Sequence, residues 1–441
     1  MTPSQRTTPL ILVGTTLIVT SAIVAFQWQR RRRGRASGGA PTSASASASG
    51  AAVAYESLIG NTPMVYLPTL SAKIHRHVYV KMESFNPGGT GKDRAALGMI
   101  RAAEQANQLP PPYSKTSCSV VTGDLESSSE PLDASILQAV QRSRTGGLVV
   151  EGTSGSTGIA LATLCASRGH ACLVVLPDDQ ATEKQIILKT LAAVVHVVPN
   201  AAISNPNHYV NVARRLAQRA AECGIPAVFM DQFENPANYA VHYSQTGPEV
   251  YRQCPKLDAF CMSSGTGGTL AGVGCYLKEI SARTATTITI ALVDPPGSSL
   301  YHKIQHGIAY APQQKERNLK RHRYDTLAEG IGLDRVTHNL AIGLQSIDQA
   351  VQVTDQEAVD MAHWLLQAEG LWVGSSSAMN VVGAVRTALD LPLDSRVVTM
   401  ICDAGQRHVT RFWNRDFIIS WGLQWPGDHE RIPECLQSIG A

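Results

Sequence analysis

The sequence lacks the cysteine patterns that stabilise small secreted domains and metal-binding domains. Its nine cysteines are an odd number, and no two of them are spaced as C-x-x-C. This usage argues against a disulfide framework and against a zinc site, and it favours a reducing compartment. We therefore predict a protein that holds no metal.

Net charge is also scarce. The formal net charge is +3 at pH 7, and much of it comes from Arg30–Arg33 together with Arg35. Without that run the chain is near neutral, so no basic surface indicates nucleic acid as a partner. A length of 441 residues with 44% hydrophobic and 17% charged residues is typical of a globular chain that can bury a large core or two packed subdomains.

One long stretch, from Thr7 to Gln29, has no charge at all. Its apolar core, Leu10–Phe26, would reach roughly 25 Å as a helix at about 1.5 Å per residue, enough for a thin bilayer. The arginines follow this run, and no small-residue cleavage site does, which favours a signal anchor over a cleaved signal or transit peptide. We expect residues 1–34 to form a transmembrane signal anchor with a basic flank, and the rest of the chain to face the cytosol.

The short span with a basic downstream flank resembles signal anchors of the mitochondrial outer membrane, and the endoplasmic reticulum is the alternative. Residues 35–54 are almost entirely Ala, Ser, Gly, Pro and Thr, so they predict a flexible tether. Residues 55–425 are predicted to form the catalytic domain, with two interleaved subdomains, and residues 426–441 a C-terminal tail.

A glycine-rich turn with one lysine, Asn86–Arg94 (NPGGTGKDR), lies between a predicted strand at Val78–Glu83 and a predicted helix at Ala95–Asn107. It is not a P-loop, because that motif needs glycine at position 86 and Ser or Thr at position 93. One interpretation is an ordinary turn with a solvated lysine. In the other, the packed elements shield Lys92 from water, which disfavours the ammonium form and frees the amine to form a Schiff base.

Two further strand–loop–helix junctions predict anion sites. Gly152–Gly158 (GTSGSTG) separates a strand at Gly147–Glu151 from a helix that begins at Ile159, although the loop could be a simple helix cap. Ser264–Thr269 (SGTGGT) precedes a helix at Leu270–Ile280 and has the backbone N–H groups that suit one phosphate dianion. Its glycine spacing does not match the dinucleotide fingerprint, so NAD is disfavoured.

Strands and helices alternate from residue 147 to residue 230, which indicates a parallel sheet covered by helices on both faces. Pro110–Gly147, rich in Pro, Ser and Thr, interrupts the pattern. We interpret it as a surface insertion with a short helix near Pro131–Gln141. A basic stretch, Lys315–Arg323, is interpreted as a solvated surface loop.

Taken in order, seven motifs between Tyr55 and Phe417 resemble those of the fold-type-II pyridoxal-phosphate family, and within it the cysteine synthases (O-acetylserine sulfhydrylases) of membrane-anchored fungal type. They are IGNTP, NPGGTGKDR, EGTSGSTGIALA, QFENPAN, GTGGTLAG, EG-x-x-x-G-x-SS and D-x-G-x-R. The resemblance implies an α/β fold with two parallel-sheet, three-layer subdomains, here preceded by one transmembrane helix. It also implies a pyridoxal 5'-phosphate cofactor and a homodimer.

The resemblance assigns roles residue by residue. Lys92 would hold the cofactor as a Schiff base, and Ser376 would hydrogen-bond its pyridine nitrogen. The residues that would hold the phosphate are Gly265, Thr266, Gly267, Gly268 and Thr269. Those that would bind the substrate carboxylate are Thr153, Ser154, Gly155 and Thr157, with Gln232 nearby. Ser156 stands where the family usually has an asparagine that contacts the cofactor's ring oxygen, which leaves the choice of substrate open.

The implied activity is β-replacement, in which sulfide displaces the leaving group of O-acetyl-L-serine through an α-aminoacrylate and yields L-cysteine. Lys92 would remove the α-proton as a general base. Two alternatives stay open. One is β-elimination of the cysteine desulfhydrase or serine dehydratase type. The other is a non-catalytic, membrane-tethered protein with the same fold.

Overall fold

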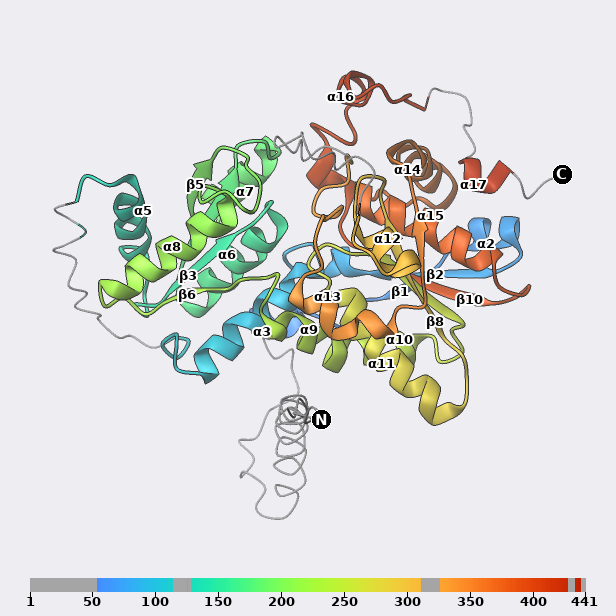
Figure 1. Cartoon of the computed structure of the whole chain (residues 1–441), viewed down its shortest axis with the longest axis horizontal. Coiled ribbons are helices and arrows are strands. Elements are labelled where there is room, and N and C mark those ends of the chain that lie inside the picture. Colours follow the sequence, from blue (N-terminus) through green and yellow to red (C-terminus); the bar gives the residue numbers. More distant parts are fainter. Residues whose placement is uncertain (1–53, 114–124, 126–127, 311–325, 427–432, 438–441) are drawn as a thin grey trace, which may run out of the picture. The chain divides into compact units, whose positions relative to one another are not determined.

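The computed structural model describes residues 54–113, 125, 128–310, 326–426 and 433–437 (Figure 1). All of them belong to one compact unit, Val53–Ala441. The predicted anchor, nearly all of the predicted tether, the basic stretch and most of the predicted C-terminal tail lie outside the described residues. Within the described ranges, no helix is both long enough and apolar enough to cross a membrane.

The larger of two sheets has six strands in the order β1-β2-β10-β7-β8-β9. β1 pairs antiparallel with β2, and every other pair is parallel. The strand bounds are β1 (Met64–Tyr66), β2 (His77–Met82), β7 (Ala259–Ser263), β8 (Thr289–Asp294), β9 (Gln349–Gln352) and β10 (Arg396–Ile401).

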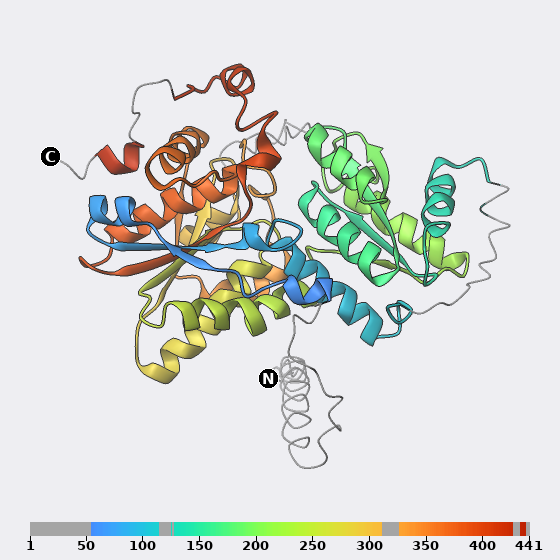
Figure 2. The same cartoon turned by 180° about the vertical axis from the view of Figure 1, so that it is seen from behind.

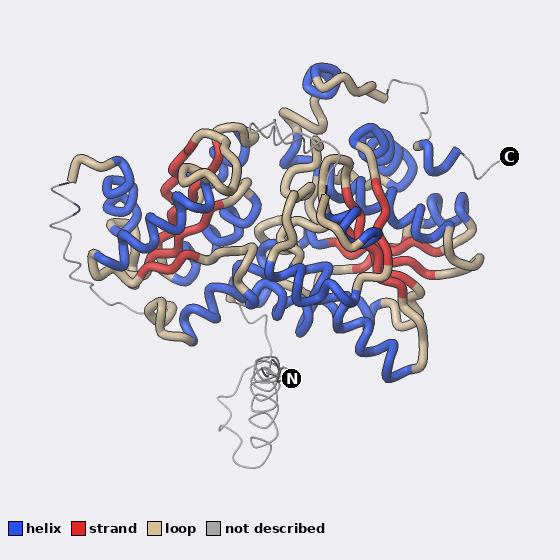
Figure 3. Tube along the Cα trace, in the orientation of Figure 1, coloured by secondary structure: helices blue, strands red, loops and turns tan. Residues whose placement is uncertain are grey.

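The smaller sheet has four parallel strands in the order β5-β4-β3-β6. Their bounds are β3 (Leu148–Gly152), β4 (Ala171–Pro177), β5 (Val194–Val198) and β6 (Ala227–Phe229). The strand expected at Gly147–Glu151 differs from β3 by one residue at each end. The sheets are seen in red in Figure 3.

Alternate residues of each strand point to opposite faces of its sheet. Both faces are apolar, and helices pack against each of them. In β7, Phe260 and Met262 face a core shared with α10 and α11, whereas Ala259 and Cys261 face a core shared with α14 and α15. Figures 1 and 2 show these helices from opposite sides. The helices packed on the large sheet are α2 (Pro68–Ile74), α10 (Gly247–Gln253), α11 (Gly268–Thr284), α12 (Leu300–His306), α13 (His338–Gly343), α14 (Asp355–Glu369), α15 (Ser375–Leu389), α16 (Arg415–Ser420) and α17 (Glu434–Gln437).

The small sheet is built in the same way. Val149 faces a core with α3, α6 and α7, and Val150 faces a core with α5 and α8. The bounds are α3 (Lys92–Gln105), α5 (Pro131–Val140), α6 (Ser156–Arg168), α7 (Thr182–Thr190) and α8 (Tyr209–Glu222). The remaining elements are α9 (Pro236–Val241) and the short turns η1 (Tyr55–Leu58), η2 (Glu83–Phe85), η3 (His242–Thr246), η4 (Leu344–Ser346) and η5 (Gly405–His408).

The predicted α/β class with parallel sheets is confirmed, and two details differ from expectation. The short helix expected near Pro131–Gln141 is confirmed as α5. The interpretation of this segment as a surface insertion is wrong there, because Ile136 and Ala139 are buried against β4, β5 and α8. Strands β8 and β9 were not expected from the sequence. Both pair in parallel at one edge of the large sheet, and β9 is only four residues long, with two apolar residues between two glutamines and no alternation to signal a strand.

Candidate active site

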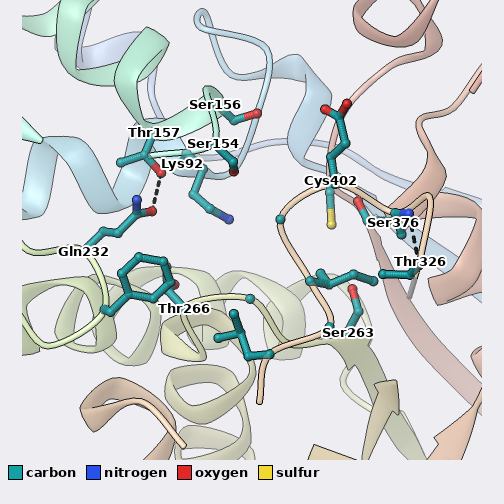
Figure 4. Close-up of a pocket in the computed structure, with 18 of the residues that line it drawn as sticks. Lys92, Ser154, Ser156, Thr157, Gln232, Ser263, Thr266, Thr326, Ser376 and Cys402 are labelled. Atoms are coloured by element: carbon teal, nitrogen blue, oxygen red, sulfur yellow. Dashed lines mark hydrogen bonds between the residues drawn. The ribbon is translucent and has the colours of Figure 1, made fainter. Parts of the chain in front are cut away.

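The predicted cofactor lysine, Lys92, is the first residue of α3 and follows β2, the short turn η2 and the glycine-rich loop. Hydrogen bonds between its own residues and their neighbours hold the loop before Lys92 in place. The Gly88 N–H donates to the Asp93 carboxylate at 2.5 Å, and the Asn86 side-chain amide donates to Glu83 at 2.9 Å. The Lys92 amine itself has no hydrogen-bond or ion-pair partner among the described residues, and it extends into a cavity (Figure 4).

A buried network of charges lies beneath this loop. The Arg94 guanidinium is fully buried and donates to the carboxylates of Glu83 at 2.7 and 2.8 Å and of Glu249 at 2.8 Å. Lys81, also fully buried, pairs with Glu249 at 2.8 Å. Arg94 lowers the pKa of both carboxyls, that of Glu249 to about 2, despite the opposing effect of burial. Two cations and two anions therefore fix the start of α3 and the loop that presents Lys92.

The cavity has a volume of about 250 Å³, and its wall comes from the carboxyl ends of strands in both sheets. The predicted site residues in its wall are Lys92, Ser154, Ser156, Thr157, Gln232, Gly265, Thr266, Gly267, Thr269 and Ser376. Three other predicted residues, Thr153, Gly155 and Gly268, are not part of the wall. Thr153 is buried behind it and accepts a hydrogen bond from the Gly155 N–H at 3.1 Å, which shapes the loop.

One end of the cavity is the glycine-rich loop before α11. The backbone N–H groups of Gly265, Thr266 and Gly267 have no acceptor among the described residues. The backbone is packed too closely for side chains: a Cβ at Gly265 would lie 2.2 Å from the Gly330 carbonyl oxygen, and one at Gly267 would lie 2.5 Å from Leu340. Free N–H groups at a helix start form a site for a dianion.

The hydroxyl of Thr269 in this loop is held by His242, whose Nε2 lies 3.1 Å away. His242 is buried, and its Nδ1 lies 2.9 Å from the Thr246 hydroxyl. Burial and then the nearby Arg94 lower the pKa of His242 to about 3, so the imidazole is neutral. A neutral imidazole orients the hydroxyl without adding a charge of its own.

The opposite wall is the hydroxyl-rich loop before α6. The helix begins at Ser156, three residues earlier than expected, with Gly155 at φ 131° as its cap. The backbone N–H groups of Ser154 and Ser156 have no acceptor among the described residues. The Thr157 hydroxyl donates to the Gln232 side-chain oxygen at 2.5 Å. These donors at a helix start suit a carboxylate.

A third part of the cavity wall is small and neutral. Ser376, in the first turn of α15, lines it together with Ser263 and Cys402, which the sequence did not single out (Figure 4). Asn380 connects Ser263 and Cys402. Its side-chain oxygen accepts from the Ser263 backbone N–H at 2.7 Å, and its side-chain nitrogen donates to the Cys402 thiol at 3.4 Å. Burial raises the pKa of that thiol to about 11, so it is protonated at neutral pH. Position at a strand's carboxyl end is the signal that could have identified both residues.

The outer wall is charged, and the sequence did not reveal it either. Glu329 accepts from Lys184 of α7 and from Arg411 at 3.0 Å, while Asp403 pairs with His408 at 2.9 Å. Despite the opposing effect of burial, Lys184 and then His408 and Arg411 lower the pKa of Glu329 to about 2. Glu329 lies 145 positions from Lys184 and 82 from Arg411, so no local motif signals these two pairs.

This arrangement fits pyridoxal phosphate. Gly265, Thr266 and Gly267 offer unpaired N–H groups for its phosphate, and the unpaired amine of Lys92 suits its aldehyde. Ser376 offers a neutral hydroxyl for the ring nitrogen. The second set of free N–H groups, at Ser154 and Ser156, is left for the carboxylate of an amino acid.

Comparison with known proteins agrees with this chemistry. The chain matches the family model described as "Pyridoxal-phosphate dependent enzyme" over residues 55–403. It is 43% identical to a protein named Cysteine synthase 2 from Schizosaccharomyces pombe, over 82% of this chain and 84% of that one. It is 41% identical to the Putative mitochondrial cysteine synthase of Saccharomyces cerevisiae, over 81% of this chain and 83% of that one.

The fold is similar to that of solved structures as well. The crystal structure of O-ureido-L-serine synthase superposes with a TM-score of 0.64 and 26% sequence identity, covering 85% of this chain and 97% of the other. The family match spans both sheets and every loop of the cavity except the outer wall beyond residue 403. The chain therefore belongs to the family of pyridoxal-phosphate dependent enzymes.

Proposed function

We propose that this protein is a cysteine synthase that replaces the leaving group of O-acetyl-L-serine with sulfide to give L-cysteine. The names of relatives that are 43% and 41% identical over most of the chain support the reaction class. The observation that carries the proposal is the unpaired amine of Lys92, which lies between two loops with free N–H groups. One loop suits a phosphate and the other a carboxylate, so an amino acid and a phosphorylated aldehyde are accommodated on either side of one amine.

Pyridoxal phosphate, when bound, supplies an aldehyde carbon and an electron-withdrawing ring that weakens the bonds at Cα of an amino acid. Lys92 would hold that aldehyde, and its free amine would accept the proton from Cα of the amino acid. The partly buried position of Lys92 at the start of α3, with no partner for its amine among the described residues, leaves the amine free to move between these two tasks.

The loop from Thr153 to Thr157 orients the substrate. The N–H groups of Ser154 and Ser156 and the Thr157 hydroxyl bind the carboxylate and so fix the direction of the Cα–H bond. Ser156 lines the cavity with a hydroxyl that is shorter than the asparagine usual in the family. This leaves additional space beside the cofactor.

Ser376 binds the ring nitrogen as a neutral donor. Because a hydroxyl does not enforce a positive charge there, it limits electron withdrawal and favours loss of a β-substituent over reactions that need stronger withdrawal. The neighbouring Ser263 and Cys402 are neutral as well. None of the three side chains therefore adds a charge that would increase electron withdrawal by the ring.

The direct test is product analysis with the full-length protein. We expect L-cysteine from O-acetyl-L-serine plus sulfide, and no product from a Lys92→Ala variant. Pyruvate from L-serine or L-cysteine alone, without cysteine formation, would identify the protein as a β-eliminating enzyme instead. Absence of both products in the cofactor-loaded protein would favour a non-catalytic role.

We also propose that residues 1–34 anchor the enzyme in the mitochondrial outer membrane with its catalytic domain in the cytosol, the endoplasmic reticulum being the alternative. The uncharged run Thr7–Gln29 followed by arginines supports an anchor. Protease treatment of intact mitochondria should digest the catalytic domain, and its protection would contradict this orientation. We further propose a homodimer, which light scattering of the purified protein would test.

A further inference from the structure

Three buried side chains form a hydrogen-bonded line behind the proposed carboxylate site. The Thr157 hydroxyl donates to Oε1 of Gln232 at 2.5 Å. The Gln232 amide nitrogen donates to Oε1 of Glu151 at 3.2 Å and to the Gly152 carbonyl oxygen at 3.2 Å. Thr157, Gln232 and Glu151 are 2%, 4% and 0% exposed, so no water can replace a lost partner.

Glu151 is an unusual member of this line because it ends an otherwise apolar stretch of β3. Its Oε2 atom has no hydrogen-bond partner, and no cation pairs with it among the described residues. Burial, and next the neighbouring Asp231 carboxyl, raise the pKa of Glu151 well above its ordinary range. A carboxyl that is buried without a counter-ion holds its proton.

The direction of the hydrogen bonds conflicts with carboxylate binding. A carboxylate can only accept, so when it binds at Thr157 the hydroxyl must donate to it. Thr157 then has no proton left for Oε1 of Gln232, and two oxygen atoms with only lone pairs would face each other. Turning the Gln232 amide by half a turn removes the conflict, since its nitrogen then donates to Thr157.

That turn brings the Gln232 oxygen to Glu151. An ionised carboxylate would repel it, whereas a protonated carboxyl donates to it. That bond offsets both the lost hydrogen bond to the Gly152 carbonyl and the contact between two acceptor oxygens that replaces it. The whole line then points its donors toward the substrate: Glu151 to Gln232, Gln232 to Thr157, and Thr157 to the carboxylate. The Glu151 carboxyl turns as well, so that Oε2, which carries the proton while Oε1 accepts from Gln232, comes to face the Gln232 oxygen. No covalent bond changes, and the proton stays on Oε2.

We propose that Glu151 is a positioning residue whose carboxyl carries a proton, which lets Gln232 turn and Thr157 donate to the substrate's carboxylate. The inference rests on the proposed function, because it assumes that an amino acid binds at the Thr153–Thr157 loop. Glu151 touches neither substrate nor cofactor, and it acts only through Gln232.

The test measures the apparent Kd of L-serine from the change in cofactor absorbance of the full-length holoenzyme. Glu151→Gln keeps a neutral group that can donate or accept, so we expect a Kd within about threefold of the wild type. Glu151→Leu removes the donor, and we expect the Kd and the KM to rise about 10- to 100-fold with a much smaller change in kcat. A Kd raised more than tenfold by Glu151→Gln, or unchanged by Glu151→Leu, would overturn the proposal.

Two controls separate this role from general loss of structure. Asp294→Leu removes another buried carboxyl at the end of a strand, outside the cavity wall, and it should leave the Kd of L-serine unchanged. In a Thr157→Val background, Glu151→Leu should raise the Kd by less than about threefold, because both act through one line. An additive effect there would contradict the proposal. If Glu151→Leu does not fold, the Kd of Glu151→Gln still tests the proposal, because a rise of more than tenfold in that variant overturns it.

The proposed function can fail separately. If the wild-type holoenzyme shows no change of absorbance with L-serine, O-acetyl-L-serine or L-cysteine, the proposed amino-acid chemistry is refuted, and the inference with it. If it responds, and Glu151→Leu responds with the same Kd, only the role of Glu151 is refuted.

Discussion

Removal of Arg94 is the perturbation that tests how the lysine loop is held. The cluster beneath the loop is neutral as a whole, because Lys81 and Arg94 balance Glu83 and Glu249. Arg94→Met keeps much of the volume and leaves two buried carboxylates with one cation. Breaking a buried ion pair from one side costs about 3–5 kcal/mol. At roughly 2.1 cal/mol/K of unfolding entropy for each of the ~390 residues of Val53–Ala441, this lowers Tm by about 4–6 °C.

The effect has a defined pH dependence. In the wild type, Arg94 holds the pKa of Glu249 at about 2 and lowers that of Glu83, so their stabilisation is present above the unfolded pKa of about 4.3 and is lost as the pH falls further. In Arg94→Met, burial instead raises both pKa values above the unfolded value. The penalty is then largest at high pH and is relieved as protons bind. The Tm difference between the two proteins should therefore shrink from pH 8 to pH 5.

The assay is thermal unfolding of the cofactor-free protein, so that cofactor binding does not mask the change. A second variant sharpens it: Glu83→Gln added to Arg94→Met leaves Lys81 paired with Glu249 and no excess charge. This double variant should recover at least half of the lost Tm. A Tm change below 1 °C for Arg94→Met, or a double variant less stable than the single one, would refute the reasoning.

Two further predictions concern the cavity wall. Gly267→Ala should weaken pyridoxal phosphate binding at least tenfold in a fluorescence titration, because φ is +85° and the new Cβ would lie 2.5 Å from Leu340; Gly224→Ala, at φ +77° with open space around it, should not. Glu329→Gln should lower the free energy of unfolding by about 1–3 kcal/mol at pH 7, since it removes the charge that pairs with Lys184. Because the pKa of Glu329 is lowered to about 2, that difference should be constant from pH 5 to 8 and shrink below about pH 4, and a difference that grows in acid would be contrary to this account.

The sequence predicted the parts of the site that are local in the chain. The turn Asn86–Arg94 and the loops before α6 and α11 each join a strand to a helix within a few residues. Their glycines and hydroxyls therefore predicted the lysine turn and the two anion sites from the sequence alone. Local signals of the same kind end two helices, because Gly169 after α6 and Gly370 after α14 both take the left-handed conformation that favours glycine.

What the sequence could not supply depends on contacts between distant segments. Ser263 and Cys402 end neighbouring strands of the large sheet, yet 139 positions separate them in the chain. Lys184 meets Glu329 only because α7 and a loop of the other subdomain approach the same cavity. Glu151 looked like the polar end of a buried strand, and only the line through Gln232 gives it a role. The predicted anchor lies outside the described residues and stays a prediction.

The central claim is that the amine of Lys92 holds the cofactor's aldehyde. Borohydride reduction of the full-length holoprotein, followed by peptide mass analysis, tests it most directly because reduction makes that bond permanent. The account predicts one pyridoxyl group, on the peptide that contains Lys92, and none on the Lys92→Ala variant. A label on a different lysine, or no label on a protein shown to contain the cofactor, would contradict it.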